Sequence, residues 1–370
     1  MKRIVFTALI LLVLLSCLAP RNVQAVAGVP GSPEFGYGAW LHPDGKYFQE
    51  GLNSLSDLQL DWIAVDLDWA KWMPDPGKTP DVSALDRVMQ SAAGSGIAVM
   101  ISISNPPTWA VTKQGPDAIV TSQTLVFLAT RYAGILQAVE LFPAANTFEG
   151  WNASPDPAAY ARMYTDVKTS LTSLGIDIFL VAAGLHPVAQ TSARAWNDLD
   201  FLRGLYAAGA AQWLDVIGLR LNHLTGNPLN TSQEGMSFGL RHYEAVRQVM
   251  LDNNHPSGMI WITQLCVPDG TINSGDKVYQ NSQRQAEWLQ QTAIQIRSQL
   301  YMGVVFFQNI NPPSSSAAEF GKIALILSSD SFHPFYSVLK AIIQQTHPVG
   351  QEQSSGRPKS NSLLKCKYKT

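Results

Sequence analysis

The sequence has little cysteine and no excess of charge of one sign, and these shortages exclude several classes of protein. Three cysteines in 370 residues are too few for a disulfide framework. The formal net charge is only −2, so the chain lacks the concentrated basic face of a nucleic-acid-binding protein. With 46% hydrophobic residues the chain has enough apolar side chains for a sizeable core. A disordered or fibrous protein is therefore excluded as well.

Signatures of several common kinds of site are also missing. No glycine-rich phosphate-binding turn follows the first predicted strand, which disfavours a nucleotide site. The Gly-x-Ser-x-Gly elbow of serine esterases is absent. His186 and His223 each follow a predicted strand, but no cysteine or carboxylate stands at ligand spacing from them. We therefore expect no metal and no cofactor.

Only one stretch is apolar over a long distance, and it lies at the beginning of the chain. Two basic residues precede an apolar run over residues 4–15, which is shorter than the roughly 20 residues that span a bilayer. Val23-Gln24-Ala25 offers a small-residue cleavage site, so residues 1–25 are predicted to be a secretory signal peptide. A lipobox ending at Cys17, which would carry a lipid anchor, is the alternative. Both interpretations predict a secreted or cell-surface protein without a membrane span.

From residue 35 onward, short apolar runs alternate with amphipathic helical stretches. The predicted strands are Gly36–Leu41, Trp62–Leu67, Ala98–Ile103, Gln137–Phe142, Ile178–Ala183, Val216–Leu221, Met259–Leu265 and Gly303–Gln308. The predicted helices are Gly51–Leu60, Ser83–Gly94, Thr124–Leu136, Pro157–Leu174, Leu199–Ala211, Leu240–Leu251, Arg284–Leu300 and Phe335–Gln345. This alternation predicts a single-domain α/β (β/α)₈ TIM barrel over residues 26–346, with an open doubly wound sheet as the alternative. Residues 347–370 are predicted to be a disordered basic tail.

Two stretches of the sequence resemble a known enzyme family. One runs from Val65-Asp66-Leu67-Asp68-Trp69 to Leu85-Asp86-Arg87, and the other is Asn105-Pro106-Pro107-Thr108-Trp109-Ala110 after the third predicted strand. Both are similar to segments of retaining glycoside hydrolases of the cellulase and xylosidase type. The resemblance implies a (β/α)₈ barrel with an acid/base glutamate after the fourth strand and a nucleophilic glutamate at the seventh.

The two glutamates that this resemblance implies are both replaced. The stretch Glu140-Leu141-Phe142-Pro143-Ala144-Ala145-Asn146 matches the strand-4 motif and places Ala144 at the acid/base position. Trp261-Ile262-Thr263-Gln264 matches the strand-7 motif and places Gln264 at the nucleophile position. A retaining glycosidase needs two carboxyl groups about 5–5.5 Å apart. A methyl group and an amide cannot replace them, so the sequence predicts a pseudoenzyme that binds carbohydrate without cleaving it.

Other carboxylates offer alternatives to this prediction. Glu149 lies just beyond the altered strand-4 motif, and Asp269 follows the seventh predicted strand. Together they are the fallback pair for an active glycosidase of the inverting kind. Glu140 lies inside the fourth strand and is expected to be a buried, hydrogen-bonded residue, because an unpaired buried carboxylate is costly. A second alternative is a protein-interaction module on an inactive barrel.

Aromatic and amide side chains near the strand ends suggest where an oligosaccharide or polysaccharide would bind. Aromatic faces stack on the apolar face of a pyranose, and amides bind its hydroxyl groups. The predicted carbohydrate-binding residues are Trp69, Trp109, Asn146, Trp151, Asn222, Gln264 and Gln308. Outside the terminal segments, acidic residues outnumber basic ones, which suits a neutral or polar ligand. The sequence leaves open which sugar, which linkage and which oligomeric state.

Overall fold

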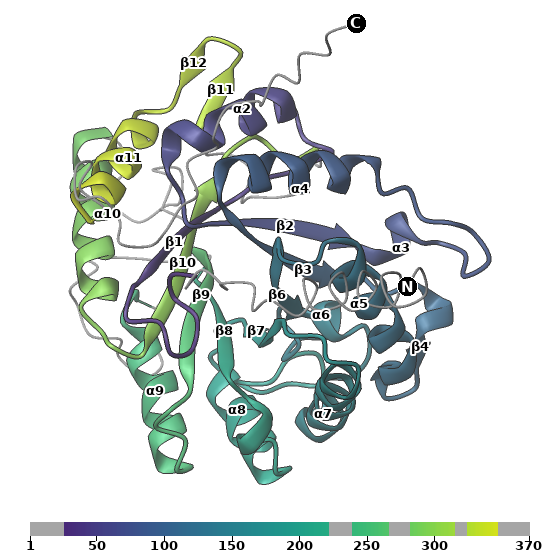
Figure 1. The fold of residues 1–370 in the computed structure, drawn as a ribbon. Helices are drawn as coiled ribbons and strands as arrows, with labels where there is room; N and C mark the ends of the chain where they lie inside the picture. Colours follow the sequence, from purple (N-terminus) through teal and green to yellow (C-terminus); the bar gives the residue numbers. More distant parts are fainter. Residues whose placement is uncertain (1–25, 222–238, 266–281, 315–323, 347–370) are drawn as a thin grey trace, which may run out of the picture. The chain divides into compact units, whose positions relative to one another are not determined.

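Eight parallel strands close into a barrel in the computed structural model, which describes residues 26–221, 239–265, 282–314 and 324–346 (Figure 1). The strands are β1 (Gly36–Trp40), β2 (Trp62–Asp68), β3 (Ala98–Ser104), β6 (Leu136–Leu141), β7 (Phe179–Leu185), β8 (Val216–Leu221), β9 (Met259–Leu265) and β10 (Met302–Asn309). Their order around the barrel is β1-β10-β9-β8-β7-β6-β3-β2. The predicted (β/α)₈ fold is confirmed, and residues 27–348 form one compact unit.

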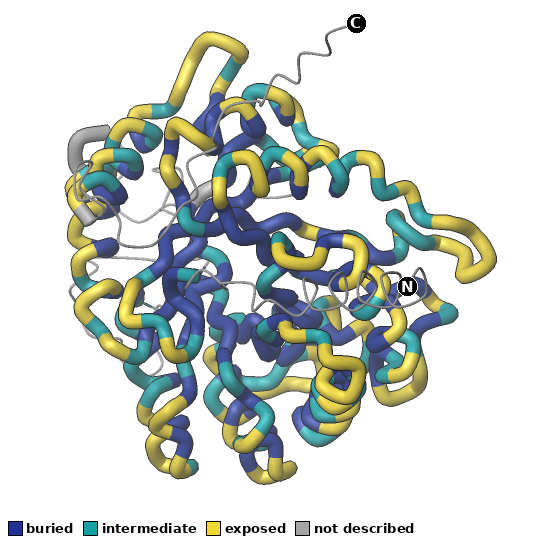
Figure 2. Tube along the Cα trace, in the orientation of Figure 1, coloured by how far each residue is buried: buried dark blue, intermediate teal, exposed yellow. Residues whose placement is uncertain are grey.

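Helices cover the outside of this barrel, and their outward faces are exposed (Figure 2). The longer helices are α2 (Phe48–Leu58), α4 (Ser83–Ser95), α5 (Ala118–Arg131), α7 (Pro157–Ser173), α8 (Asp198–Ala207), α9 (His242–Asp252), α10 (Ser282–Arg297) and α11 (Pro334–Thr346). No helix among the described residues is both long and apolar enough to cross a membrane. In α7 the Asp156 side chain accepts hydrogen bonds from the amides of Ala158 and Ala159, and Pro157 is the first helical residue.

One helix begins well before its predicted first residue. The apolar periodicity predicts a helix over Thr124–Leu136, whereas α5 spans Ala118–Arg131. The Asp117 carboxylate accepts hydrogen bonds from two amides of the first turn and fixes the start of the helix there. The chain then leaves the helix at Tyr132 and passes through Gly134 with φ +82° before β6 begins. The first residue of α5 is therefore set by the Asp117 cap, and the apolar periodicity does not locate it.

Several short elements that the sequence did not predict lie in the loops that follow the strands. They are α3 (Trp69–Trp72), α6 (Phe148–Trp151), the hairpin of β4 (Val111–Thr112) with β5 (Gly115–Pro116), and the hairpin of β11 (Ile326–Ser328) with β12 (Ser331–Phe332). Segments of two to four residues carry no readable periodicity, so their absence from the prediction follows from their length.

The interior of the barrel is filled by large side chains at its N-terminal end. Trp62 and Trp261 meet edge to face with ring centroids 5.0 Å apart, and Phe306 packs on both. Each indole donates to the segment before β1, Trp62 to the carbonyl of Ala27 and Trp261 to that of Gly28. Both tryptophans are fully buried. Because this end is closed, any open site in the barrel is at the other end.

Candidate functional site

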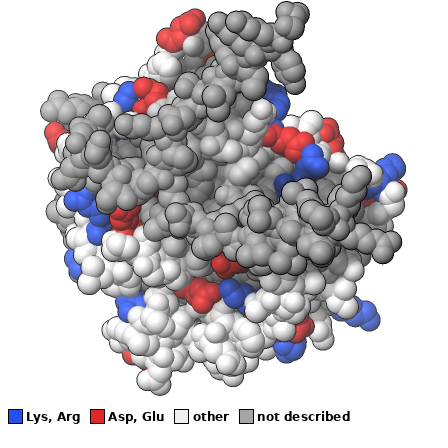
Figure 3. All heavy atoms as spheres, viewed as in Figure 1, with Lys and Arg blue, Asp and Glu red and all other residues white. Residues whose placement is uncertain are grey.

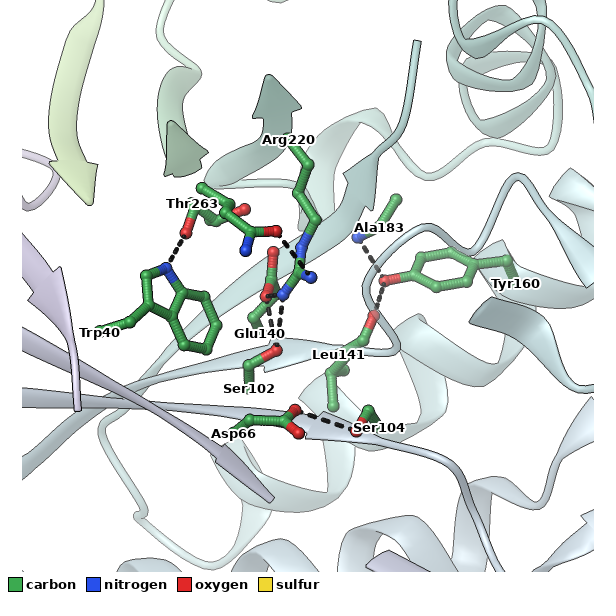
Figure 4. Close-up of polar contacts among 11 residues, drawn as sticks. Trp40, Asp66, Ser102, Ser104, Glu140, Leu141, Tyr160, Ala183, Arg220 and Thr263 are labelled. Atoms are coloured by element: carbon green, nitrogen blue, oxygen red, sulfur yellow. Dashed lines mark hydrogen bonds and ion pairs between the residues drawn. The ribbon is translucent and has the colours of Figure 1, made fainter. Parts of the chain in front are cut away.

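The mouth of the barrel, meaning the C-terminal ends of the strands and the loops after them, carries a layer of polar side chains (Figure 4). Asp66 on β2, Ser102 on β3 and Glu140 on β6 pair in register across neighbouring strands. Arg220 on β8 pairs in the same way with Gln264 on β9. Register partners project from the same face of a sheet. In barrels of this fold the active groups gather at this end.

Glu140 is a fully buried carboxylate in this layer. Its Oε2 accepts hydrogen bonds from Ser102 Oγ at 2.6 Å and from Arg220 Nη2 at 2.7 Å. A Cβ at Gly184 would lie 2.4 Å from Glu140 Oε1, so a side chain there would collide with the carboxylate. Gly184 and Ala183 have positive φ in an irregular part of β7, which lets the chain pass this close. The expected buried, hydrogen-bonded role of Glu140 is confirmed.

The two positions that match the missing glutamates lie at the mouth. The Oε1 atom of Gln264 faces Arg220 Nη1 at 3.4 Å, and Gln264 is half-buried. Ala144 is also half-buried and adopts φ +57°, with its amide donating to the carbonyl of Gly184 at 2.9 Å. Gln264 thus belongs to the polar layer. The assignment of these positions to the catalytic glutamates stays a prediction from the motifs.

Two predicted sugar-binding tryptophans are buried, so the expectation that they line an open surface is wrong. Trp69 is 0% exposed and packs between Trp109, at 5.9 Å, and Phe142, at 6.5 Å. Trp151 is 1% exposed, packs edge to face on Phe142 and donates from Nε1 to the carbonyl of Gln114. The loops after β2, β3 and β6 fold against one another and enclose these rings. In this conformation neither ring presents a face to a ligand.

Asn146 is buried too, and its hydrogen bonds serve the protein. Its Nδ2 donates to the carbonyls of His186 and Trp196, and its Oδ1 accepts from the amide of His186. The side chain therefore ties the loop after β6 to the loop after β7. The prediction that Asn146 binds carbohydrate through an accessible amide is wrong for this conformation, since its donors and acceptor are already engaged.

The other predicted carbohydrate-binding residues are either partly accessible or lie outside the described residues. Trp109 is half-buried, with its indole Nε1 donating to the carbonyl of Pro74 at 3.2 Å. Asn222 and Asp269 lie outside the described residues, and so does the side chain of Gln308. Among the residues that the structure describes, Trp109 and Gln264 are therefore the two predicted carbohydrate-binding residues that remain partly accessible.

Glu149, one member of the fallback pair, is an exposed surface residue. Its carboxylate forms an ion pair with Arg194, whose guanidinium also lies 4.5 Å from the centroid of the Phe148 ring. The hydrogen bond from Arg194 lowers the pKa of Glu149. A general acid needs a raised pKa to hold its proton near neutral pH, so this shift has the wrong direction for that role.

Asp66 and His42 join the polar layer without having been predicted as site residues. Asp66 is exposed and its Oδ1 accepts a hydrogen bond from Ser104 Oγ at 3.0 Å. The strands around it limit the hydration of the carboxylate, and this raises the pKa of Asp66 although Arg220 and His42 act in the opposite direction. The His42 Nε2 lies 2.9 Å from Asn309 Oδ1, and burial lowers the pKa of the imidazole.

A signal for Asp66 was present in the sequence. Asp66 and Asp68 alternate with Val65 and Leu67 in a strand that is otherwise apolar, so both acids project from the inner face of the barrel. Asp68 lies at the end of β2 and serves the structure, because it accepts from the amide of Lys71 and caps α3. Asp66 lies two residues earlier on the same strand, and its side chain does not cap a helix.

The described residues hold no cluster of three or more histidine, cysteine or acidic side chains that would bind a metal ion. Acidic and basic side chains are interspersed on the visible described part of the face in Figure 3.

No protein-family model matches the sequence, and no curated protein matches it. Solved structures do match the fold. A family 39 glycoside hydrolase from Bacteroides cellulosilyticus aligns with a TM-score of 0.61 at 15% identity over 83% of this chain. The match covers 63% of that enzyme, so the chain spans less than two thirds of its length.

Two further matches extend over most of both chains. The xylanase 10B of Thermotoga maritima aligns with a TM-score of 0.58 at 12% identity, covering 88% of this chain and 98% of the enzyme. The endo-β-1,4-mannanase of Thermotoga petrophila aligns with a TM-score of 0.57 at 12% identity, covering 87% and 79%. At such identities the likeness shows the fold. The chain has a (β/α)₈ barrel similar to the barrels of these enzymes.

Proposed function

We propose that this barrel binds a carbohydrate at its mouth and does not hydrolyse it by the two-carboxylate mechanism. The observation that carries the proposal is the contact of Gln264 with Arg220 in the polar layer of the mouth. In the motif match this position belongs to the nucleophile, and here an amide occupies it. The proposed ligand class rests on the fold likeness to enzymes described as xylanase and mannanase.

The chemistry of the two positions supports the absence of retaining hydrolysis. Such hydrolysis needs one carboxyl group to protonate the leaving oxygen and a second, about 5–5.5 Å away, to attack the anomeric carbon. Gln264 is neutral and Ala144 has no proton to give. General acid catalysis alone contributes roughly 10²–10⁴-fold. Glu140 does not substitute, because it is buried and engaged by Ser102 and Arg220.

The same layer retains groups that bind hydroxyls. The contact with Arg220 occupies Oε1 of Gln264, which leaves the amide Nε2 as a donor toward a ligand hydroxyl. Asp66 is an exposed acceptor, and Trp109 is a half-buried aromatic side chain in the loop after β3. Donors, acceptors and an aromatic ring at one end of a barrel are the composition of a sugar site.

Binding and turnover are tested on the same panel of sugars. Isothermal calorimetry with gluco-, xylo- and manno-oligosaccharides is expected to show binding that weakens at least fivefold in Gln264→Ala, roughly one lost hydrogen bond. Aryl glycosides of the same sugars are expected to release no aglycone. Turnover that depends on Glu149 and Asp269 would establish the inverting glycosidase instead. An absence of binding to every sugar would favour the protein-interaction module.

We also propose that the protein is exported, by the signal peptide over residues 1–25 or as a lipoprotein modified at Cys17. The support is the sequence pattern alone. Mass spectrometry of the mature N-terminus from a secreting host distinguishes the two, because cleavage after residue 25 and a lipidated cysteine differ in mass. An uncleaved protein retained in the cytoplasm would overturn the proposal.

A further inference from the structure

Asp66 differs from the other acidic side chains at the mouth in how it is held. Glu140 is fully buried and paired with Arg220, and Asp68 caps α3 and binds Lys71. Asp66 accepts one hydrogen bond from the neutral hydroxyl of Ser104 and is otherwise exposed. Figure 4 shows its carboxylate and that hydroxyl beside the Glu140–Arg220 group. Among these three acids, Asp66 has the most exposed side chain and the fewest hydrogen-bond and ion-pair partners.

The charges around Asp66 compensate its negative charge only in part. The groups that act on its carboxylate are Arg220, Ser104, His42 and Asp68. Arg220 is the full cation of this set, and its Nη2 is engaged by Glu140 at 2.7 Å. Burial lowers the pKa of His42 and so disfavours the charged form of its imidazole. An anionic ligand group next to Asp66 would therefore meet a net negative charge, because Asp66 and Glu140 share the one guanidinium of Arg220.

The same layer also contains buried polar atoms that have no hydrogen-bond partner among the described residues. They are Glu140 Oε1, Arg220 Nε and Thr263 Oγ1. Thr263 adjoins Gln264 on β9, and its carbonyl accepts from the indole of Trp40, which lies under the Arg220 guanidinium. Most buried polar groups in proteins are hydrogen-bonded, so three exceptions in one layer are informative.

We propose that Asp66 sets the charge selectivity of the carbohydrate site, so that the barrel accepts neutral sugars and rejects uronic acids. The inference rests on the proposed carbohydrate-binding function. Hydroxyl groups of a neutral sugar donate to Asp66 Oδ2, whereas the carboxylate of a uronate has no proton to donate and is repelled. Like charges placed together at an interface suppress binding of the wrong partner.

The test compares neutral oligosaccharides with uronic acid oligomers of the same length and linkage by calorimetry at low salt. The wild-type protein is expected to bind the uronate at least about tenfold more weakly than its neutral counterpart. In Asp66→Asn the difference in affinity between the neutral and the uronate oligomer is expected to shrink to within about threefold, because the amide keeps the shape of the side chain and removes its charge. The matched control is Asp75→Asn, an exposed acid in the loop after β2, which is expected to keep the wild-type gap.

Two results separate this inference from the function on which it rests. Equal binding of neutral and uronate oligomers by the wild type, or an unchanged gap in Asp66→Asn, overturns the role of Asp66 and leaves carbohydrate binding intact. Failure of the wild type to bind any neutral oligomer overturns both. If Asp66→Asn does not fold, Asp66→Ser replaces it. The wild-type comparison needs no variant, and its gap is expected to narrow in 1 M salt, where the Debye length is about 3 Å.

Discussion

Arg220 and Glu140 form an ion pair across the barrel, with Nη2 and Oε2 2.7 Å apart and side-chain exposures of 15% and 0%. The pair joins β8 to β6, and the same guanidinium reaches Gln264 on β9 at 3.4 Å. The Arg220 guanidinium therefore contacts both β6, which matches the acid/base motif, and β9, which matches the nucleophile motif.

Breaking the pair on one side should destabilise the barrel. Arg220→Met leaves the carboxylate of Glu140 buried without its cation, and removing one partner of a buried pair costs about 3–5 kcal/mol. Urea denaturation should show this loss as a shift of the midpoint at constant slope. The control is Arg203→Met on α8, whose pair with Asp200 is half-exposed and whose loss should cost less than about 1 kcal/mol. Equal costs would contradict the buried role.

Restoring both carboxyl groups should restore some hydrolysis. The double variant Ala144→Glu with Gln264→Glu supplies an acid and a nucleophile at the two motif positions. We expect measurable aglycone release from aryl glycosides by the double variant, and none by either single variant or the wild type. Wild-type turnover that survives Glu149→Gln and Asp269→Asn but is lost when Gln264 is changed would show that the mechanism is misassigned. A folded, inactive double variant would mean that the mouth has been remodelled around these positions.

The two neighbouring tryptophans after β2 and β3 should behave differently. Trp69 is fully buried, so Trp69→Ala should lower the free energy of unfolding by about 3–5 kcal/mol. Trp109 is half-buried, so Trp109→Ala should cost less stability and weaken sugar binding instead. Thermal melts and calorimetry on both variants check this. Weakened binding in a stable, folded Trp69→Ala variant would show that its burial is not maintained in solution.

The pH dependence of stability should report on Asp66. Its pKa is raised above the ordinary value of 3.8, chiefly by desolvation and against the effects of Arg220, Ser104 and His42, while Asp68 acts in the same direction as desolvation. The ionised form is therefore disfavoured in the folded protein, and the penalty appears as pH rises through the ordinary and then the raised pKa.

Asp66→Asn removes that penalty, so the variant should be more stable than the wild type at pH 7. The difference should shrink toward zero as pH falls below 3.8, where both folded and unfolded wild-type chains hold the proton. Denaturation midpoints between pH 3 and pH 8 measure it. A constant difference across this range would mean that the substitution acts through packing and that the charge is not involved.

The architecture could be predicted because its signals are local. An apolar run of six or seven residues can be recognised as a buried strand, and the amphipathic stretch after it as a helix, from their own residues. Eight such pairs in succession are compatible with few folds. Local signals also placed the beginning of α7 at Pro157 and the end of α4 before Gly96, where φ is +68°. The burial of Glu140 followed from the cost of an unpaired charge inside a strand.

What the sequence by itself determined was the barrel, the order of its strands and the residue types at each strand end. Only the tertiary structure decided which of those side chains face a ligand. Trp151 reaches the carbonyl of Gln114, and Asn146 joins two loops, through contacts between segments that are far apart in the chain. Asp66 lies in the same layer and keeps an exposed side chain. Exposure depends on what every other loop covers, and that information is not local.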